Sequence, residues 1–292
     1  MNNKIILLYL LLNFNYIISE SLVYNFKIAQ ITKDLSLDKD DNHTSFNTLI
    51  FNQYKKRYDL TQEYFIAPLF SYINSFEHYC FRIDSSFGHI KQKLNKKTLY
   101  SGENIDDLLL TFSKGFKNKK NIHSISFLLG MPTHKIYSLQ HPSVGYGQFS
   151  LGIQYDGLIE TKQNEAFLYG ARCIYFIPKN AFDLNHNNYK FTIGSLIDLL
   201  VSYKKNWDKK GVEIGYNLKF SCDAKIKPLN IELIQKLNYS RNSFFFVYKY
   251  KVMICDVLNK IFFNITYGFD NKSNSFNLKH FISTWIFYSL EY

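Results

Sequence analysis

The sequence lacks any apolar run after its N-terminal segment that is long enough for a membrane-spanning helix, since such a helix needs about 20 mostly apolar residues. It also lacks a Cys-x-x-Cys pair, because Cys80, Cys173, Cys222 and Cys255 lie far apart. That spacing argues against a zinc site and against a dense disulfide framework. No P-loop, dinucleotide-binding glycine pattern, His-Glu-x-x-His or Gly-x-Ser-x-Gly motif occurs. We therefore expect no cofactor and no bound metal.

Charge is spread along the chain rather than gathered into one basic stripe. The net charge of +11 and the isoelectric point near 9.2 raise nucleic acid and anionic lipid as partners. The lysines are scattered, however, and many fall in short clusters such as Lys117–Lys120 and Lys204–Lys210. We therefore expect no nucleic-acid partner. With 46% hydrophobic and 20% charged residues, the chain is neither disordered nor a helical membrane protein.

The first residues are typical of an export signal. Lys4 supplies a positive charge, and Ile5–Leu12 form a short apolar core. Asn13 and Asn15 end that core well short of the length of a spanning helix, which argues against a membrane anchor. We predict a signal peptide over residues 1–20, without a defined cleavage site.

An alternation of apolar and polar residues carries the prediction of the fold. Aromatic residues make up 18% of the chain, a bias that favours strands. In the clearest segment, 211–222, every second residue is apolar, and the positions between them hold polar residues or glycine. Segments 148–156, 189–204 and 260–270 follow the same pattern. Because side chains of a strand point alternately to its two faces, each segment has one apolar row and one wet row.

Segment length separates a membrane barrel from a soluble sandwich. Strands that cross a bilayer need about 9–11 residues, whereas globular strands average about five or six, and the alternating segments here are long. Short and long polar connections alternate, which suits tight turns at one rim and loops at the other. We predict an all-β transmembrane antiparallel up-and-down β-barrel of about 12 strands, within a range of about 10 to 14, over residues 61–292. Residues 21–60 would then be a lead-in that forms either a first strand or a plug.

The last strand-like segment, residues 280–292, ends on an aromatic residue. By alternation, Ile286, Tyr288, Leu290 and Tyr292 lie on one face of it. This arrangement resembles the C-terminal strand of bacterial outer-membrane barrels, which the barrel-insertion machinery reads. We therefore expect localisation in the cell outer membrane, with outer-membrane lipid and the insertion machinery as partners.

Two short motifs resemble those of a known group of proteins. Residues 126–133 read Ser-Phe-Leu-Leu-Gly-Met-Pro-Thr, and residues 145–152 read Gly-Tyr-Gly-Gln-Phe-Ser-Leu-Gly. Together they resemble the strand, Gly-x-Pro-Thr, loop, Gly-x-Gly, strand signature of outer-membrane channel proteins of the MetA-like pathway type. His134 stands where that family commonly has glycine. The resemblance implies a barrel whose first motif climbs to an extracellular loop, and transport of small hydrophobic molecules.

One pair of residues raises a catalytic alternative. Outer-membrane phospholipases and lipid A deacylases carry a His-x-Ser pair, and His141 and Ser143 have that spacing. In such a site the histidine takes the serine proton, and Asp156 would orient the histidine. Pro142 places the pair in a loop rather than in a strand, and Val144 stands where those enzymes have asparagine. We therefore expect no enzymatic activity, with a lipid hydrolase as the alternative.

The wet row supplies the remaining candidates for function. Its side chains would either border a water-filled pore with a mild anion preference or pair with one another and fill a narrow barrel. These pore-lining candidates are Arg82, Asp84, Gln154, Asp156, Arg172, Lys190, Asp198, Glu213, Lys219, Lys249 and Lys251. We expect a channel or transporter for small solutes. A surface barrel without transport and a soluble secreted β-sandwich binding module are the alternatives.

Overall fold

The computed structural model describes residues 43–57, 60–76, 78–94, 97–105, 107–118, 121–133, 147–182, 188–192, 194–222, 225–228, 235–236, 239–254, 257–271 and 280–291. The regular elements in these ranges are all β-strands. In chain order they are β1 (His43–Arg57), β2 (Leu60–Phe76), β3 (Tyr79–Leu94), β4 (Lys97–Ile105), β5 (Leu108–Asn118), β6 (Asn121–Met131), β7 (Ser150–Lys162), β8 (Glu165–Phe176), β9 (Lys179–Phe182), β10 (Asn188–Thr192), β11 (Ser195–Asn206), β12 (Lys210–Cys222), β13 (Lys225–Pro228), β14 (Gln235–Lys236), β15 (Tyr239–Ile254), β16 (Val257–Asn271) and β17 (His280–Glu291). Within the described ranges there is no helix long and apolar enough to cross a membrane.

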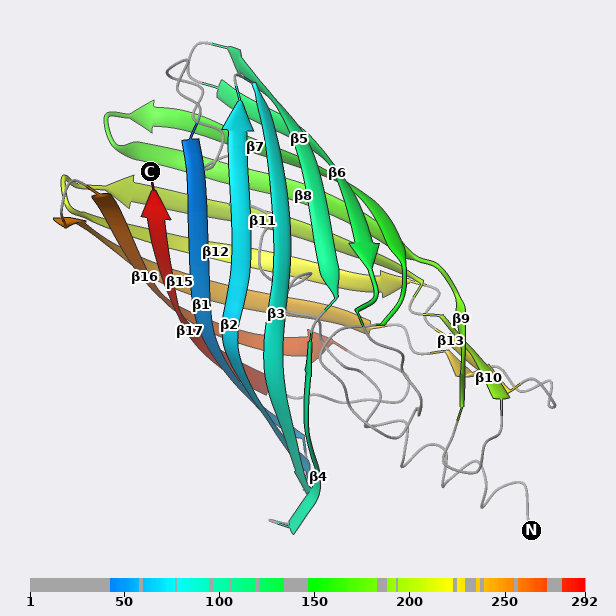
Figure 1. The fold of residues 1–292 in the computed structure, drawn as a ribbon. Coiled ribbons are helices and arrows are strands. Elements are labelled where there is room, and N and C mark those ends of the chain that lie inside the picture. The colour runs from blue at the N-terminus through cyan, green and yellow to red at the C-terminus, as the bar shows by residue number, and fades with distance from the viewer. Residues whose placement is uncertain are drawn as a thin grey trace, which may run out of the picture.

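One 13-stranded sheet makes up the wall of the molecule. Strand β1 pairs with β2 on one side and with β17 on the other, and the pairings β2–β3 and β3–β5 continue the order. From β5 the order runs through β6, β7, β8, β11, β12, β15 and β16 to β17. Apart from β4, which pairs with β3, these strands form a ring of antiparallel neighbours that returns to β1 (Figure 1). The predicted all-β antiparallel up-and-down barrel is confirmed.

The two rims of the barrel differ in their connections. At the rim where β1 begins and β17 ends, the connections span only residues 77–78, 119–120, 163–164, 207–209 and 255–256. We call this the turn-side rim. At the opposite, loop-side rim the longer connections span residues 95–107, 132–149, 177–194, 223–238 and 272–279, and one short connection spans residues 58–59. Short turns and long loops therefore segregate, as in outer-membrane barrels, whose short turns face the periplasm.

One feature of the wall differs from the sequence prediction. The segment 189–204 is not one strand: β10 and β11 lie in different sheets, and Gly194 separates them. Its φ of 75° is a left-handed value that favours glycine, and its carbonyl accepts the N–H of Phe176 at 3.0 Å. Strand β1 begins at His43, within the segment 21–60, for which the sequence left a first strand and a plug as alternatives.

Short strands extend the wall beyond the barrel at the loop side. Strands β14, β13, β10 and β9 form a separate four-stranded sheet (Figure 1). Strand β3 is longer than its neighbour β5, so it pairs with β5 over Tyr79–Asp84 and with β4 over Phe87–Leu94. The described strands thus extend farther at the loop side than at the turn side.

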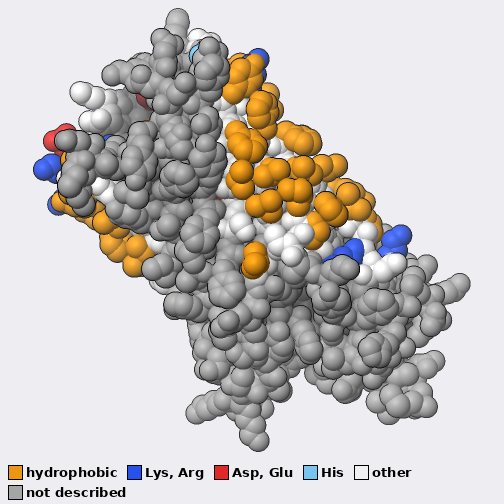
Figure 2. All heavy atoms as spheres, viewed as in Figure 1, with side chains coloured by type: hydrophobic (Ala, Val, Ile, Leu, Met, Phe, Trp, Pro, Cys, Tyr) orange, Lys and Arg blue, Asp and Glu red, His pale blue; other side chains and the backbone are white. Residues whose placement is uncertain are grey.

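Burial alternates clearly along β5, β6 and β8 and along the first half of β7, with polar or small residues often buried and large apolar residues exposed. On β8 the pattern is iBeBiBeBeBeB, where buried positions face the interior. Figure 2 shows apolar side chains gathered on the outer surface of the wall. Exposed members of this outward row include Phe112, Ile125, Phe127, Leu151, Ile153, Phe167, Val201, Ile214, Phe244 and Ile265. An apolar surface of this size is costly in water and stable in lipid.

Candidate functional site

A row of polar side chains crosses the inner face of the wall at one level. The strand registers place each member directly opposite the next member on the neighbouring strand. In order from β5 to β15 the row consists of Ser113, Ser126, Gln154, Arg172, Asp198, Lys219 and Arg241. Each of these residues is buried. We call this row the polar belt.

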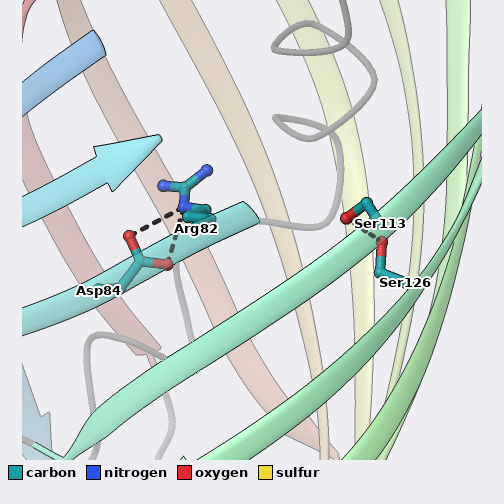
Figure 3. A network of polar contacts seen from close by, with 4 residues as sticks. All are labelled: Arg82, Asp84, Ser113 and Ser126. Carbon is teal, nitrogen blue, oxygen red and sulfur yellow. Dashed lines mark hydrogen bonds and ion pairs between the residues drawn. The ribbon is translucent and has the colours of Figure 1, made fainter. Parts of the chain in front are cut away.

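Hydrogen bonds join neighbouring members of the polar belt. The hydroxyls of Ser113 and Ser126 lie 2.8 Å apart and point toward one another from β5 and β6 (Figure 3). Arg172 donates from Nε and Nη2 to Oδ2 of Asp198 at 3.0 and 2.7 Å. Both side chains are only 2% exposed. A buried charge without an opposite charge would be costly, so this pairing keeps the belt stable inside the wall.

Further polar pairs flank the belt on the same inner face. Nε of Arg82 donates to Oδ1 and Oδ2 of Asp84 at 2.9 and 2.8 Å, and both residues lie on β3 (Figure 3). On β7, Gln154 donates from Nε2 to Oδ2 of Asp156 at 2.6 Å. The charges of Arg82 and Asp84, like those of Arg172 and Asp198, are therefore matched locally.

Apolar layers lie on both sides of the polar belt. Toward the loop side the inner face carries the loop-side apolar layer, which comprises Leu109, Leu128, Ile174, Phe176 and Leu196. Toward the turn side, Leu158, Ala166 and Leu168 form a turn-side apolar layer, with Ile122 and Leu200 packed against it. An inner face of this kind differs from that of a water-filled porin, whose lumen is polar.

Several inner side chains on the arc of the wall from β3 to β12 are almost inaccessible to solvent. Leu168, Ile174 and Phe176 are 0% exposed. Arg172 is 3% exposed. A side chain that borders an open water path would keep an accessible face. The arc from β3 to β12 therefore carries no wide aqueous passage in this conformation.

Two polar atoms on the turn side of the belt have no protein partner. Oγ of Ser124 and Oδ1 of Asp156 are buried without a hydrogen bond, and these residues lie directly opposite one another on β6 and β7. A buried polar atom that lacks a partner costs about 1–3 kcal/mol. Their presence at one place on the inner face favours contact with water or with a polar group of a solute.

The connection between β6 and β7 is fixed at both ends to the stretch where β4 ends and β5 begins. The amide of Gly147 donates to both carboxylate oxygens of Asp107 at 3.0 and 3.1 Å, and Lys179 donates to the Gly147 carbonyl at 2.7 Å. At the other end, Oγ1 of Thr133 donates to the carbonyl of Ile105 at 3.1 Å. Gly147 has a φ of 59°, which a side chain would disfavour.

Asp107 and Lys179 bring opposite charges to this anchor. Asp107 is fully buried, and Lys179 is half-buried. Burial lowers the pKa of the Lys179 ammonium below its usual value, and the nearby Asp107 carboxylate partly opposes that shift. The carboxylate thus holds Gly147 by its N–H, and the ammonium holds it by its carbonyl.

Most of the predicted pore-lining residues lie on the inner face. Those that are buried there are Arg82, Asp84, Gln154, Asp156, Arg172, Asp198, Glu213 and Lys219. Lys249 and Lys251 are half-buried on β15 near the turn-side rim, and Nζ of Lys249 lies 5.3 Å from the ring centre of Phe262. Lys190 departs from the prediction, because it is exposed on β10 in the separate four-stranded sheet.

Only one member of the alternative catalytic set is described. His141 and Ser143 lie outside the described residues, as does Tyr292 of the insertion signal. Asp156 is buried on the inner face of β7, where it accepts a hydrogen bond from Gln154. Ile286 of the insertion signal is exposed on β17, on the outward face with Ile282.

Sequence reasoning missed Ser113, Ser126 and Arg241 of the polar belt. Ser113 and Ser126 were not singled out, although both occupy polar positions of alternating strands. Asp107 was missed because it precedes β5 and follows no motif. Only the strand register brings these residues to their partners. Among the described residues, no group of three or more histidine, cysteine, aspartate or glutamate side chains could hold a metal ion.

No protein-family model matches the sequence. No curated protein matches it either.

Solved structures do resemble the fold. An outer membrane channel from Pseudomonas putida F1 superposes with a TM-score of 0.68 at 10% identity, over 88% of this chain and 98% of that chain. The translocator domain of the autotransporter NalP from Neisseria meningitidis gives a TM-score of 0.49 at 7% identity, over 92% and 94%. The toluene transporter TbuX from Ralstonia pickettii gives 0.48 at 10% identity, over 88% and 90%. The first of these establishes the fold of this chain as that of an outer-membrane β-barrel, and it agrees with the resemblance seen in the sequence.

Proposed function

We propose that this chain is an outer-membrane channel or transporter that passes small, largely apolar solutes through the barrel lumen. The layered inner face is the observation that carries this proposal. A solute that enters from the loop side first meets Leu109, Leu128 and Phe176, and next meets the polar belt. The unpartnered atoms of Ser124 and Asp156 then offer hydrogen bonds on the turn side. Such a surface suits a small apolar molecule with one polar group better than it suits hydrated ions.

Two further observations support the proposal. The Pseudomonas structure with the same fold is a channel. The sealed inner arc agrees with a narrow, solute-selective path and disagrees with a general porin, because a porin lumen is wide and wet. The outward apolar row and the segregated rims support a place in the outer membrane.

Conductance in a planar lipid bilayer tests the proposal. We expect the wild-type barrel to conduct ions weakly, since Arg172 and Asp198 bridge β8 and β11 inside the wall. The charge-balanced double variant Arg172→Ala, Asp198→Ala removes this bridge and should raise the conductance. A small aromatic alcohol added on the loop side should lower the current of the double variant, because it competes for the same path.

The outcomes separate the alternatives. A large steady conductance of the wild type would identify a general porin. A double variant that inserts, conducts nothing and is indifferent to the solute would identify a surface barrel without transport. Insertion is read independently on a gel, because a folded barrel migrates differently before and after boiling.

We also propose that the chain acts without hydrolysis. The inward position of Asp156 and its bond from Gln154 give that carboxylate a structural role on the inner face. Lipid hydrolysis by the wild type that disappears in Ser143→Ala, with unchanged migration of the unboiled variant, would overturn this part of the proposal.

A further inference from the structure

Lysines and aromatic rings meet on the outer face of the turn-side rim. On the hairpin of β11 and β12, Nζ of Lys205 lies 5.9 Å from the ring centre of Trp207, and it pairs with Glu165 at 2.9 Å. Trp207 is 48% exposed, and Lys209 and Lys210 are exposed beside it. Aromatic rings in a barrel mark the boundary between hydrocarbon and headgroups. The exposed ammonium groups of this hairpin therefore lie at headgroup level.

The backbone of this hairpin end is held from several sides. Asn206 donates its N–H to the carbonyl of Asn164 at 2.8 Å, and Trp207 donates to the carbonyl of Lys210 at 2.6 Å. Lys251 donates to the carbonyl of Lys209 at 2.8 Å. The turn is thus tied to the β7–β8 turn and to β15. Its lysines are presented from a fixed frame rather than from a loose loop.

The same arrangement occurs on the hairpin of β5 and β6. Nζ of Lys114 lies 5.4 Å from the ring centre of Tyr79 and 5.7 Å from that of Phe116. Lys114 is exposed, and no acidic side chain among the described residues forms an ion pair with it. The sequence of this hairpin, from Leu108 to Met131, contains lysines and no aspartate or glutamate.

Charge on the turn-side rim is therefore in excess where it meets the headgroups. Within Lys204–Lys210 there are four lysines and one aspartate, which gives +4 − 1 = +3. Of these lysines, Lys205 is neutralised by Glu165, and Lys209 and Lys210 face outward without such a bond among the described contacts. An ammonium at this depth extends toward the interface and attracts anionic headgroups.

We propose that the outer turn-side rim binds anionic phospholipid, with the lipid phosphate held by Lys209 and Lys210 beside Trp207 and a second such contact at Lys114. The partner is an anionic lipid headgroup of the leaflet that surrounds the short turns. This selectivity concerns the outer face, so it holds whether or not the lumen conducts.

Fluorescence of Trp207 tests the proposal, because the chain has only 2 tryptophans. The full chain with Trp285→Phe is reconstituted in vesicles that contain brominated phosphatidylglycerol or brominated phosphatidylcholine, which quench tryptophan on contact. We expect stronger quenching by the glycerol lipid, and a preference that falls roughly 25-fold in Lys209→Gln, Lys210→Gln, because each of the two lysines contributes about fivefold at a charged surface. The preference should also weaken as salt is raised.

The matched control is Lys225→Gln, Lys227→Gln on β13, which removes two lysines at the loop side. It should leave the lipid preference unchanged. Equal quenching by both lipids in the parent protein would overturn the proposal, and so would a preference that the control variant lowers as much as the rim variant does. Each variant is scored only where its unboiled migration matches that of the parent, so misfolding is read separately.

Discussion

The inner and outer faces of the same strands follow opposite rules. On β7, Ile153 points outward and is 64% exposed, whereas its chain neighbour Gln154 points inward and is 2% exposed. In a soluble domain such an isoleucine would be the core residue. Here the apolar row faces a medium as apolar as itself, so it gains little by packing. The two faces must therefore contribute to the fold in different ways.

The outer face requires only that its side chains be apolar. The inner face requires that each polar side chain meet a particular interaction partner. Any large apolar side chain satisfies lipid, so outward positions tolerate exchange within that class. An inward arginine is stable only beside its aspartate, because a buried charge without a partner is expensive. Specific pairs between strands on the inner face favour one register over its neighbours. Register therefore depends on the inner row, and insertion depends on the outer row.

Breaking the buried pair should have the largest effect. Asp198→Ala leaves the guanidinium of Arg172 inside the wall without its carboxylate, which should lower the free energy of unfolding by about 3–5 kcal/mol. The measurement is urea unfolding of the barrel in lipid vesicles, followed by tryptophan fluorescence.

Replacing both partners by leucine is the control for that loss. Arg172→Leu, Asp198→Leu removes the charges together and should come close to the wild type, since apolar replacement of a buried pair is often neutral. A loss below about 1 kcal/mol in the single variant, the range of exposed ion pairs, would mean that water reaches this pair and that the inner arc is open.

A charge on the outer face should have the next largest effect. Ile153→Arg places a guanidinium within the apolar row of β7, where lipid cannot solvate it, and should lower the free energy of unfolding in vesicles by about 2–4 kcal/mol. Ile153→Leu keeps the apolar character and should cost less than about 1.5 kcal/mol.

The position of the charge provides a second comparison. Gln163→Arg adds the same side chain in the exposed turn between β7 and β8, where headgroups and water solvate it. It should be close to neutral, because the penalty falls to about 0–1 kcal/mol near the interface. If Ile153→Arg were as harmless as Gln163→Arg, the outward row would not face lipid.

Much of this architecture is visible in the sequence because the two faces alternate with the period of a strand. Segment 211–222 predicted β12 nearly to its ends, and the long final segment predicted β17. The buried row and the exposed row of β12 fall where the alternation put them. Such patterns are local, so no knowledge of distant contacts is needed to read them.

Other features depend on contacts between distant residues and left no local sign. The bond from Gly147 to Asp107 joins residues 40 positions apart. The polar belt is one row only because seven strands share a register that sequence periodicity does not fix. The break at Gly194 was missed because apolar residues continue the alternation on both sides of it. Register and backbone conformation are therefore the parts that required the structure.

Among the described residues, each face of the wall has a glycine that lies under an aromatic ring. Gly157 faces outward on β7 and lies opposite Tyr169, whose ring occupies the place of the missing side chain. Gly215 faces inward on β12 and lies opposite Phe245 in the same way. In both pairs the ring covers the glycine backbone. The two sites thus differ chiefly in the medium that surrounds the ring.

Adding one methyl group at each glycine gives the smallest and sharpest test of the comparison. Gly215→Ala would push its Cβ into the Phe245 ring and to 2.6 Å from Cβ of Ser202, whose hydroxyl donates to Glu213 at 2.9 Å. The inner face has no room to yield, so the free energy of unfolding should fall by about 1–3 kcal/mol.

Gly157→Ala should cost only about 0.5 kcal/mol, the usual range for a surface change. The Tyr169 ring can turn into the lipid, where it gives up a 3.3 Å contact with His123 and its contacts with the rings of His123 and Tyr155. Urea unfolding in vesicles measures both variants, and Tyr169→Ala and Phe245→Ala backgrounds remove each ring in turn. The penalty of Gly215→Ala should shrink in the Phe245→Ala background, and that of Gly157→Ala should change little. Equal penalties at the two glycines would mean that the inner face yields as readily as lipid does, and the distinction between a partner-specific inside and a permissive outside would then be wrong.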